Sequence, residues 1–378
     1  MTRVVMFAGG GTAGHVFPAI ATARALQQLE PDLEPVFVGV ADRLEGRLVP
    51  AAGFRFHAVA TPSVPRRPSP RLLTLPGALR RSVAEVTGLL RAEGAVAAVT
   101  FGGYVSFPVA RGAAKLELPL VIHEQNAVPG LANRLAARWA DRIAVSVPGS
   151  VVWFRRSERC AVTGNPVREE IAGLDRDALR TGARERFGLR PDRPTLLVFG
   201  GSQGARSINR AIVDSYGLWG DMDLQILHAT GRATHEVTAT AWAKVRESGP
   251  GPKVTVVEFI EQMGDAYAAA DLVICRAGAT SLAELSALGI PSVLVPYPHA
   301  TADHQTENAQ ALARAGGAVV VADGDLDGRT LVETCRPILA DPDRLSRMSS
   351  ASKAFGRPDA AANVARLVPA LLERGSPR

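Results

Sequence analysis

The sequence predicts an α/β protein made of two domains, each built on a parallel sheet with helices on both faces. The chain has 378 residues, which is more than a single hydrophobic core usually organises. Short apolar runs alternate with helical stretches, and this pattern is typical of parallel strands that are buried on both faces. The pattern of strand, glycine turn and helix begins again midway along the chain, at Arg193–Asp214. This repetition predicts two similar domains in tandem.

The first domain begins with a buried strand at Val4–Ala8, a glycine turn, and a helix from about Phe17. We expect Pro18 in the first turn of that helix, where its missing N–H costs little. Further continuous apolar runs predict strands in the first half of the chain at Pro35–Val40, Pro119–Gln125 and Asp141–Val147.

The second domain follows a join near Thr163–Glu169 and continues beyond its first strand, turn and helix. Further strands and turns are expected at Val254–Ile260, Asp271–Leu285 and Ile290–Pro298. The predicted domains are therefore 1–165 and 166–357. The remaining segment, 358–378, is predicted to be an amphipathic helix that crosses back to the first domain.

Composition narrows the class of protein. Hydrophobic residues make up 47% of the chain, which indicates a packed globular protein and not a disordered one. The formal charge of +6 has two explanations, an anionic partner or an arginine-rich composition. Because no basic run with interleaved aromatic residues occurs, we do not expect nucleic acid as a partner.

The cysteines and the N-terminus indicate the compartment. Cys160, Cys275 and Cys335 are far apart and odd in number, so neither a disulfide framework nor a metal site is predicted. A reducing cytoplasm fits this pattern. Glycines and a histidine interrupt the first apolar run, so a signal peptide is not expected. No apolar run reaches the roughly 18 residues that mark a membrane span.

A proline-rich stretch at Val59–Pro70 predicts an exposed loop, and a helical stretch follows it. Leucines and arginines stand side by side in this helix, and two interpretations are open. The favoured one is an ordinary helix with one face in the core, and the other is a basic amphipathic surface that rests on anionic lipid. The residues concerned are Leu72, Leu73, Leu75, Leu79, Arg71, Arg80 and Arg81.

The glycine turns are the strongest chemical signal. A strand that ends in glycines and opens a helix directs backbone N–H groups at one point, and such turns hold phosphate. The first turn, GGGTAG, also fits GxGxxG through Gly9, Gly11 and Gly14, with Asp42 as a possible ribose ligand of a dinucleotide. An NAD(P)-dependent oxidoreductase is therefore one hypothesis. A P-loop is excluded, because His15 and Val16 occupy its Lys and Ser/Thr positions.

The second and third turns carry different polar groups. The second, FGGSQGAR, offers the hydroxyl of Ser202. In the third, CRAGATSLAEL, Ser281 and Glu284 have the spacing of a capping box, and the alternative is that Glu284 binds a ribose diol. Glycine turns in both halves favour a nucleotide-sugar enzyme over a hydride-transfer enzyme.

Eight motifs occur along nearly the whole chain in a familiar order. They are GGGTAGHVFPA, FGGYVSFP, HEQNAVPG, GNPVR, GGSQGA, FI before a helix, CRAGATSLAEL and DHQTENA. Together they resemble the MurG family within glycosyltransferase family 28. The resemblance implies a GT-B fold, which has two Rossmann-like domains with parallel sheets facing across a cleft.

The resemblance also implies the reaction. It implies inverting, metal-independent transfer of GlcNAc from UDP-GlcNAc to the MurNAc 4-hydroxyl of lipid I, which gives lipid II in peptidoglycan synthesis. No cofactor is then expected. The implied location is the cytoplasmic face of the bacterial plasma membrane, as a peripheral protein on an anionic surface. A cell-wall synthesis complex is a further possible partner.

Carried over position by position, the resemblance assigns contacts with UDP-GlcNAc to a defined set of residues. They are Thr12, Ala13, Gly14, Asn126, Arg168, Ser202, Ile260, Ala279, Thr280, Ser281, Leu282, Ala283, Glu284 and Gln305. Arg168 and Ser202 are expected on the diphosphate side, and Ile260 beside the uracil. Glu284 is expected to bind the ribose diol, and Gln305 to lie near the sugar hydroxyls.

His15 is the expected catalytic residue. A general base must take the proton of the acceptor hydroxyl, and histidine titrates near neutral pH. The alternative is a structural role, in which His15 fixes the glycine turn or a substrate phosphate. The helix start at Ala279–Ser281 and Arg168 are expected to stabilise the departing UDP without a metal.

Two departures from the family pattern leave alternatives open. Ala13 stands where family members usually carry glycine, and Val59–Pro70 replaces a GLRGKG-like loop on the acceptor side. A related enzyme that glycosylates another lipid-linked or antibiotic-type acceptor is therefore a second hypothesis. Tyr104 is expected near the cleft. A non-catalytic nucleotide-sugar-binding or scaffold protein is a third hypothesis, and only turnover excludes it.

Overall fold

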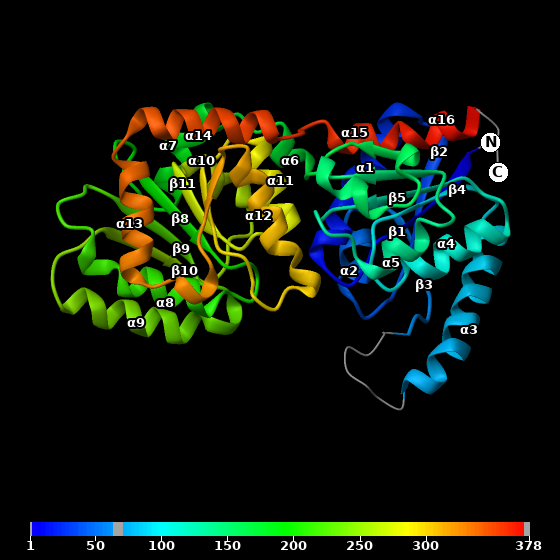
Figure 1. Cartoon of the computed structure of the whole chain (residues 1–378), viewed down its shortest axis with the longest axis horizontal. Coiled ribbons are helices and arrows are strands. Elements are labelled where there is room, and N and C mark those ends of the chain that lie inside the picture. The colour runs from blue at the N-terminus through cyan, green and yellow to red at the C-terminus, as the bar shows by residue number, and fades with distance from the viewer. Residues whose placement is uncertain (1, 63–70, 374–378) are drawn as a thin grey trace. The chain divides into compact units, whose positions relative to one another are not determined.

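The chain folds into two units, and each is built on its own parallel sheet (Figure 1). The structure is a computed structural model that describes residues 2–62 and 71–373. Unit 1 comprises Met1–Arg168 and Arg357–Arg378, and unit 2 comprises Glu169–Gly356. The sequence-based boundaries lie at 165/166 and 357/358. The predicted α/β class with two parallel-sheet domains is confirmed.

The described residues of unit 1 form a seven-stranded sheet in the order β3-β2-β1-β4-β5-β6-β7, and all its pairs are parallel. Apolar, fully buried runs such as Val4–Ala8 supply the central strands, as the two-sided burial of a parallel sheet requires. The strands are β1 (Arg3–Ala8), β2 (Leu33–Gly39), β3 (Arg55–Ala58), β4 (Ala95–Thr100), β5 (Leu120–Glu124), β6 (Arg142–Val145) and β7 (Cys160–Val162).

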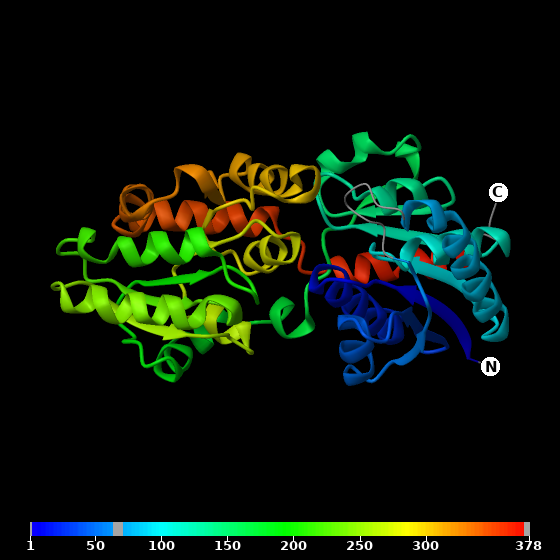
Figure 2. The same cartoon turned by 90° about the horizontal axis from the view of Figure 1, so that it is seen from below.

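Helices cover both faces of this sheet. One face packs against α1, α2, α15 and α16 through residues such as Val16, Val49 and Val364, and the other packs against α3, α4 and α5. The C-terminal helix α15 packs against α1, and α16 continues from it over the same face of the sheet (Figure 1 and Figure 2). The helices are α1 (Ala13–Leu29), α2 (Leu44–Ala51), α3 (Arg71–Ala92), α4 (Ser106–Lys115), α5 (Leu131–Ala136), α15 (Ala360–Ala365) and α16 (Leu367–Glu373), with short 3₁₀ turns at Pro148–Trp153 and Ser157–Arg159.

Helix α1 differs from its predicted bounds. It begins at Ala13 and not near Phe17, so Pro18 lies inside the helix and the prediction of a first-turn proline is wrong. Pro18 has no N–H to donate to the carbonyl of Gly14. The helix therefore starts within the glycine motif itself, and the motif's last residues form its first turn.

The described residues of unit 2 form a six-stranded parallel sheet in the order β10-β9-β8-β11-β12-β13. The sequence predicts no strand at β4 or β9, nor at β3, β7 and β13, which have only three or four residues each. Alanines dominate β4, and the polar residues Gln225 and His228 interrupt the apolar pattern of β9. The strands are β8 (Thr195–Phe199), β9 (Gln225–Ala229), β10 (Lys253–Val257), β11 (Leu272–Cys275), β12 (Ser292–Leu294) and β13 (Ala318–Val320).

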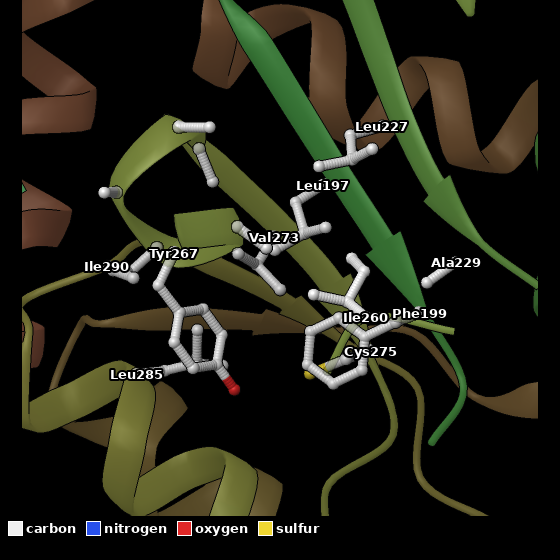
Figure 3. Packing of buried hydrophobic residues seen from close by; sticks show 14 of the residues in the cluster. Leu197, Phe199, Leu227, Ala229, Ile260, Tyr267, Val273, Cys275, Leu285 and Ile290 are labelled. Atoms are coloured by element: carbon white, nitrogen blue, oxygen red, sulfur yellow. The ribbon is translucent and has the colours of Figure 1, made fainter. Parts of the chain in front are cut away.

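Two cores lie on the two faces of this sheet. The first unites α7, α10, α11 and α12 with the strands through residues such as Leu197, Tyr267 and Leu285 (Figure 3). The second lies beneath α8, α9, α13 and α14 and contains the fully buried Trp219 and Trp242. The helices are α6 (Glu169–Ala172), α7 (Arg176–Arg186), α8 (Arg206–Asp214), α9 (His235–Glu247), α10 (Met263–Ala269), α11 (Ala279–Ala287), α12 (His304–Arg314), α13 (Gly328–Leu339) and α14 (Pro342–Phe355), with 3₁₀ turns at Tyr216–Leu218, Arg232–Thr234, Thr301–Asp303 and Asp323–Asp325.

Strand order decides where each unit can bind a ligand. Chain order reverses between β1 and β4 in unit 1 and between β8 and β11 in unit 2. In open parallel sheets, ligands bind outside the carboxyl ends of the strands at such a switch point. The first and second glycine turns follow β1 and β8, and the third follows β11.

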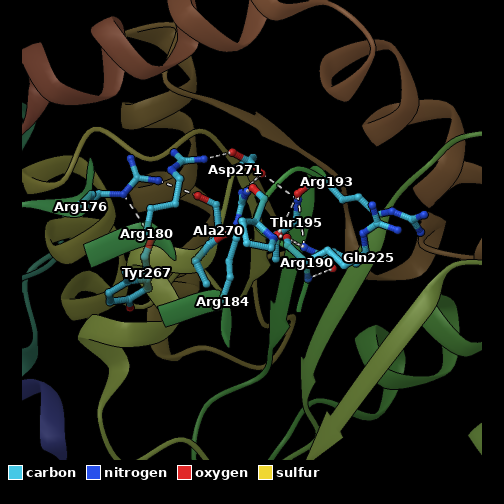
Figure 4. A network of polar contacts seen from close by, with 12 residues as sticks. Arg176, Arg180, Arg184, Arg190, Arg193, Thr195, Gln225, Tyr267, Ala270 and Asp271 are labelled. Atoms are coloured by element: carbon cyan, nitrogen blue, oxygen red, sulfur yellow. Dashed lines mark hydrogen bonds and ion pairs between the residues drawn. The ribbon is translucent and has the colours of Figure 1, made fainter. Parts of the chain in front are cut away.

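Asp271 joins the amino end of β11 to helix α7 (Figure 4). Its carboxylate accepts hydrogen bonds from Arg184 at 2.6 Å and from the N–H of Thr195 at 2.7 Å, and it also pairs with Arg180. The Arg184 side chain is only 4% exposed. Burial lowers the pKa of its guanidinium, so Asp271 offsets the cost of a buried positive charge.

We predict that Asp271→Ala lowers the free energy of unfolding of the chain by about 3 kcal/mol, because it leaves the Arg184 charge buried without its carboxylate. The matched control is Asp214→Ala, which removes an exposed pair with Arg210 and should cost no more than ~0.5 kcal/mol. Urea denaturation of both variants measures the difference. Equal losses would contradict a special role for Asp271.

Candidate active site

A buried carboxylate holds the first glycine turn of unit 1. Glu45, in the first turn of α2, is 2% exposed. Its carboxylate accepts the N–H of Gly11 at 3.0 Å and the N–H of Val40 at 3.3 Å. A Cβ on Gly10 would lie 2.4 Å from a Glu45 carboxylate oxygen, so this close approach requires glycine. The anion at this turn is therefore one of the protein's own side chains.

This contact bears on the dinucleotide hypothesis. In the GxGxxG fingerprint the second glycine lets the backbone approach a pyrophosphate. Here that glycine is Gly11, whose N–H is donated to Glu45, and the carboxylate repels a second anion. Asp42, the expected ribose ligand of a dinucleotide, lies exposed in the turn before α2. The geometry disfavours NAD(P) at this turn.

His15 lies in the first turn of α1 with its ring held by the backbone. Its Nδ1 lies 3.0 Å from the carbonyl oxygen of Gly10 and 3.2 Å from the hydroxyl of Thr12. A carbonyl only accepts, so the proton of the neutral ring is on Nδ1 and donated to Gly10. The lone pair is then on Nε2, which is the tautomer that a general base needs.

The turn after β4 approaches that nitrogen closely. Gly102 has φ +91°, and a Cβ there would lie 3.0 Å from Nε2 of His15. Its neighbour Gly103 packs against the backbone of Gly10. The two glycine turns of unit 1 therefore pack together at the switch point, and Gly102 lets the backbone approach the His15 ring closely.

A second buried carboxylate holds the HEQN segment after β5. Glu124 is 1% exposed and accepts the backbone N–H of Asn126 at 2.9 Å, the Asn126 side-chain amide at 3.2 Å and the N–H of Gly130 at 3.1 Å. The side chain of Asn133 donates to it at 2.9 Å. Burial raises the pKa of Glu124, and these donors act in the opposite direction. The orientation of Asn126 is fixed by Glu124.

His123 precedes this carboxylate and is fully buried. Its Nε2 donates to the carbonyl of Gly164 at 3.0 Å, and burial lowers its pKa to about 4. It is therefore neutral at physiological pH.

In unit 2, the loops after β8, β9 and β10 lie at one edge of the sheet. The backbone N–H of Arg232 donates to the carbonyl of Ser202 at 3.1 Å, which joins the turns after β8 and β9. The Arg232 guanidinium lies 4.6 Å from the ring centroid of Phe259. Ile260 follows Phe259, and its side chain is 6% exposed within the first core.

Helix α11 begins directly after the turn that follows β11. Its N-cap is Gly278, and no side chain caps it. The first N–H groups, of Ala279, Thr280 and Ser281, have no intrahelical acceptor, so the helix start attracts an anion. The Thr280 hydroxyl is buried and has no hydrogen-bond partner among the described residues. Leu282 packs into the core, and Ala283 is partly exposed beside it.

The predicted capping box does not form. Ser281 lies inside α11 and not at its N-cap, because Gly278 takes that position. Glu284 is therefore a mid-helix residue, and it is 3% exposed. Its carboxylate accepts a hydrogen bond from the Tyr267 hydroxyl at 2.9 Å. The capping explanation for Glu284 is wrong, and its partner is a side chain of α10.

Gln305, in the first turn of α12, accepts the backbone N–H of Tyr297 at 2.9 Å and so fixes the loop after β12. Arg276 supports the same loop. It donates to the carbonyls of Val295 and Pro296 at 3.2 Å, pairs with Asp323, and lies 5.5 Å from the Tyr297 ring.

The predicted site residues thus fall into two groups. Thr12, Ala13, Gly14, His15 and Asn126 follow β1 and β5 of unit 1, at one edge of its sheet. Arg168 also belongs to unit 1, and its guanidinium lies 5.3 Å from the Phe17 ring of α1. The remaining residues, Ser202, Ile260, Ala279–Glu284 and Gln305, lie in loops and helix starts at one edge of the sheet of unit 2. Tyr104, expected near the cleft, is 41% exposed in the turn after β4.

Sequence reasoning missed four residues that hold these loops. Glu124 and Arg276 lie inside quoted motifs, so their position next to Asn126 and to the third turn was a usable signal. Glu45 is an acidic residue in the first turn of the helix after the neighbouring strand, which is a weaker signal. Tyr267 has no local signal, because its role depends on the packing of α10 against α11.

The described residues hold neither a metal-binding cluster nor a membrane-spanning helix. No group of three or more His, Cys, Asp or Glu side chains in this part of the chain is arranged to hold a metal ion. Across the same residues, no helix is both long enough and apolar enough to cross a membrane.

Comparison with known families identifies the class of protein. Residues 5–145 match the glycosyltransferase family 28 N-terminal domain, and residues 195–364 match the family 28 C-terminal domain. These two matches fall one in each half of the chain. The chain belongs to glycosyltransferase family 28, and the resemblance seen in its motifs is confirmed.

Relatives with full-length similarity share one name. A protein of a Nocardioides species is 45% identical over 364 residues, which cover 96% of this chain and 97% of the relative. A Streptomyces coelicolor protein is 43% identical and covers 94% of each chain. Both are named UDP-N-acetylglucosamine–N-acetylmuramyl-(pentapeptide) pyrophosphoryl-undecaprenol N-acetylglucosamine transferase.

Solved structures support the fold. MurG of Acinetobacter baumannii matches with a TM-score of 0.78 and 28% identity, over 97% of this chain and 99% of that one. UDP-GlcNAc 2-epimerase of Neisseria meningitidis matches with a TM-score of 0.69 at 12% identity, which is a likeness of fold alone. The predicted GT-B class is confirmed.

Proposed function

We propose that this chain transfers GlcNAc from UDP-GlcNAc to the MurNAc 4-hydroxyl of lipid I, with inversion at the anomeric carbon, and so forms lipid II. Membership of family 28 and relatives that carry this enzyme's name over nearly their full length support the proposal. The hypothesis of another acceptor is not favoured. Relatives at 38–45% identity are all named as transferases that act on N-acetylmuramyl-(pentapeptide) pyrophosphoryl-undecaprenol, which is lipid I. The loop on which that hypothesis rested falls mostly at 63–70, outside the described residues.

The observation that carries the donor assignment is the start of α11. Its uncapped N–H groups and the Thr280 hydroxyl have the chemistry to bind the diphosphate of UDP-GlcNAc. Glu284, less than two turns further along the helix, offers a carboxylate to the ribose diol. We assign the uracil to the backbone near Ile260, and the sugar hydroxyls to Asn126 and Gln305.

His15 is proposed as the general base. Its Nδ1–H is held by Gly10, so Nε2 accepts the proton of the attacking hydroxyl as that oxygen bonds to the anomeric carbon. The bond from the anomeric carbon to the diphosphate oxygen breaks on the opposite side.

The departing UDP gains negative charge, and we propose that the protein stabilises it without a metal. The start of α11 carries partial positive charge that needs no reorganisation during the reaction. Arg168 is proposed as a second source of positive charge. Its guanidinium lies over the Phe17 ring, so it is positioned before substrate arrives.

Membrane contact is proposed for helix α3. Leu75 and Leu79 are half-buried and Arg80 and Arg81 are exposed, while Val83 and later residues enter the core. The side chains of Leu72 and Leu73 lie outside the described residues. The interpretation of a helix with one face in the core therefore holds from Val83 onward, and the membrane-surface interpretation stays open for the residues before it. We propose that its first half rests on the anionic cytoplasmic face of the membrane, where a cell-wall synthesis complex would also assemble.

We expect the full chain to transfer labelled GlcNAc from UDP-GlcNAc to a soluble lipid I analogue, with full activity in excess chelator. Product formation is followed by chromatography, with and without added Mg²⁺. Loss of activity in chelator that Mg²⁺ restores would contradict metal independence. Saturable binding of UDP-GlcNAc without any transfer would contradict the proposed acceptor and leave the donor site standing.

We expect His15→Ala to lower kcat by roughly 10²–10⁴-fold, the usual contribution of a general base. The Kd for UDP-GlcNAc should change far less, since most of the residues assigned to the donor belong to unit 2. The matched control is His57→Ala, which removes a histidine at β3 that pairs with Glu93 and should leave kcat within about twofold. Equal losses of kcat and donor affinity would exclude the base role.

We expect the chain to bind anionic vesicles in a salt-dependent way, because exposed arginines near a charged surface each contribute about 1 kcal/mol. The double variant Arg80→Glu, Arg81→Glu should weaken binding by at least tenfold. The control Arg206→Glu, Arg210→Glu on α8 of unit 2 changes the net charge equally and should have little effect. Vesicle sedimentation measures both, and binding that ignores salt and lipid charge would refute the electrostatic contact.

A further inference from the structure

Tyr267 of α10 is a buried polar residue that the proposed mechanism does not yet use. It is 1% exposed and lies within the first core of unit 2 (Figure 3). Its ring meets the ring of Phe199 edge to face, with 6.2 Å between centroids. Its hydroxyl donates to Oε2 of Glu284 at 2.9 Å. A buried tyrosine hydroxyl needs a polar partner, and this one finds a carboxylate on the helix assigned to the nucleotide.

The backbone of Tyr267 is fixed from the other side by helix α7. Arg176 donates through Nε to the carbonyl of Tyr267 at 3.2 Å and through a terminal nitrogen to the carbonyl of Ala270 at 2.6 Å (Figure 4). A third contact reaches the carbonyl of Leu288, at the end of α11. Arg176 therefore holds the ends of α10 and α11 together, and the Tyr267 ring has little freedom to move.

The contact with Tyr267 sets the direction of the Glu284 carboxylate. A glutamate side chain has three rotatable bonds, and fixing one of its oxygens removes most of that freedom. The phenol has a single proton, so in donating to an ionised carboxylate it forms a charge-assisted bond, which is stronger than a neutral one. A ribose diol presents two adjacent O–H donors, and a carboxylate accepts both only when its plane is correctly oriented.

We infer that Tyr267 is a positioning residue that orients Glu284 toward the two hydroxyls of the donor ribose and so sets the preference for a ribonucleotide over a 2′-deoxyribonucleotide. This inference rests on the proposed donor site. Tyr267 acts through Glu284 and touches no substrate itself. Its effect is therefore confined to ligands that carry both hydroxyls.

The test is Tyr267→Phe in the full chain, because phenylalanine keeps the ring and removes only the hydroxyl. Titration calorimetry gives the Kd of UDP and of 2′-deoxy-UDP for each protein. We expect the Kd of UDP to rise about fivefold to tenfold, the usual effect of one hydrogen bond. The Kd of 2′-deoxy-UDP should change by less than about twofold. The ratio of the two constants is the readout.

Two further variants test whether Tyr267 acts through Glu284. Tyr216→Phe removes the hydroxyl of another buried tyrosine, in the core on the opposite face of the same sheet, and should leave the ratio unchanged. Glu284→Ala should abolish the preference for UDP. Adding Tyr267→Phe to Glu284→Ala should then cause no further loss, since the hydroxyl acts only through that carboxylate.

The outcomes separate this inference from the proposed function. If the unaltered chain does not bind UDP, the donor site itself is refuted. If it prefers UDP and Tyr267→Phe keeps the same ratio, only the role of Tyr267 is refuted. If the role of Tyr267 were merely structural, Tyr267→Phe would lower the fraction of folded protein and weaken the binding of UDP and of 2′-deoxy-UDP equally. The ratio of the two Kd values would then stay unchanged. Independent, additive losses in the double variant would also overturn the inference.

Discussion

A carboxylate removed from water must find hydrogen-bond donors, and this requirement determines how the loops of both units are held. Glu45, Glu124 and Glu284 are 2%, 1% and 3% exposed, and each lies near the carboxyl end of a parallel strand. Each finds its donors in neighbouring loops or helices. Glu45 holds the first glycine turn, Glu124 holds the turn that carries Asn126, and Glu284 is held by Tyr267. Removing the donors would leave a buried charge, so the arrangement is strongly constrained.

The two units have the same parallel-sheet topology around their switch points, but the groups at these switch points differ. In unit 1 the protein's own carboxylate occupies the first glycine turn, and the histidine beside it is held by the backbone through Nδ1. In unit 2 the helix start on the other side of the switch point, after β11, has no side-chain cap. The same strand, turn and helix pattern therefore holds a histidine by its backbone in one unit and leaves a helix start uncapped in the other.

Preorganisation is the common theme of these sites. The His15 ring is oriented by a carbonyl, Asn126 by a carboxylate, and the loop after β12 by Gln305 and Arg276. Groups that are fixed before substrate arrives pay no reorganisation cost at the transition state. For glycosyl transfer this matters most at the diphosphate, where charge develops as the bond to the sugar breaks.

The sequence alone determined the α/β class, the repeat of the strand, glycine turn and helix in both halves of the chain, and the family. It also supplied most of the residues named for the candidate site. These features are local, because strand runs, glycine turns and ordered motifs can each be recognised within a short stretch. It misplaced the start of α1 and proposed a capping box at Ser281 that does not form, because Gly278 takes the N-cap position.

Only the tertiary structure decided which distant groups meet. Glu45 lies 34 residues from Gly11, and Arg176 lies 91 residues from the carbonyl of Tyr267 that it holds. No local pattern specifies such pairs, because they depend on strand order and on how helices pack across the sheet. The partner of Glu284 was likewise settled by the packing of α10 against α11. Sequence thus predicted the candidates for the chemistry, and packing decided what orients them.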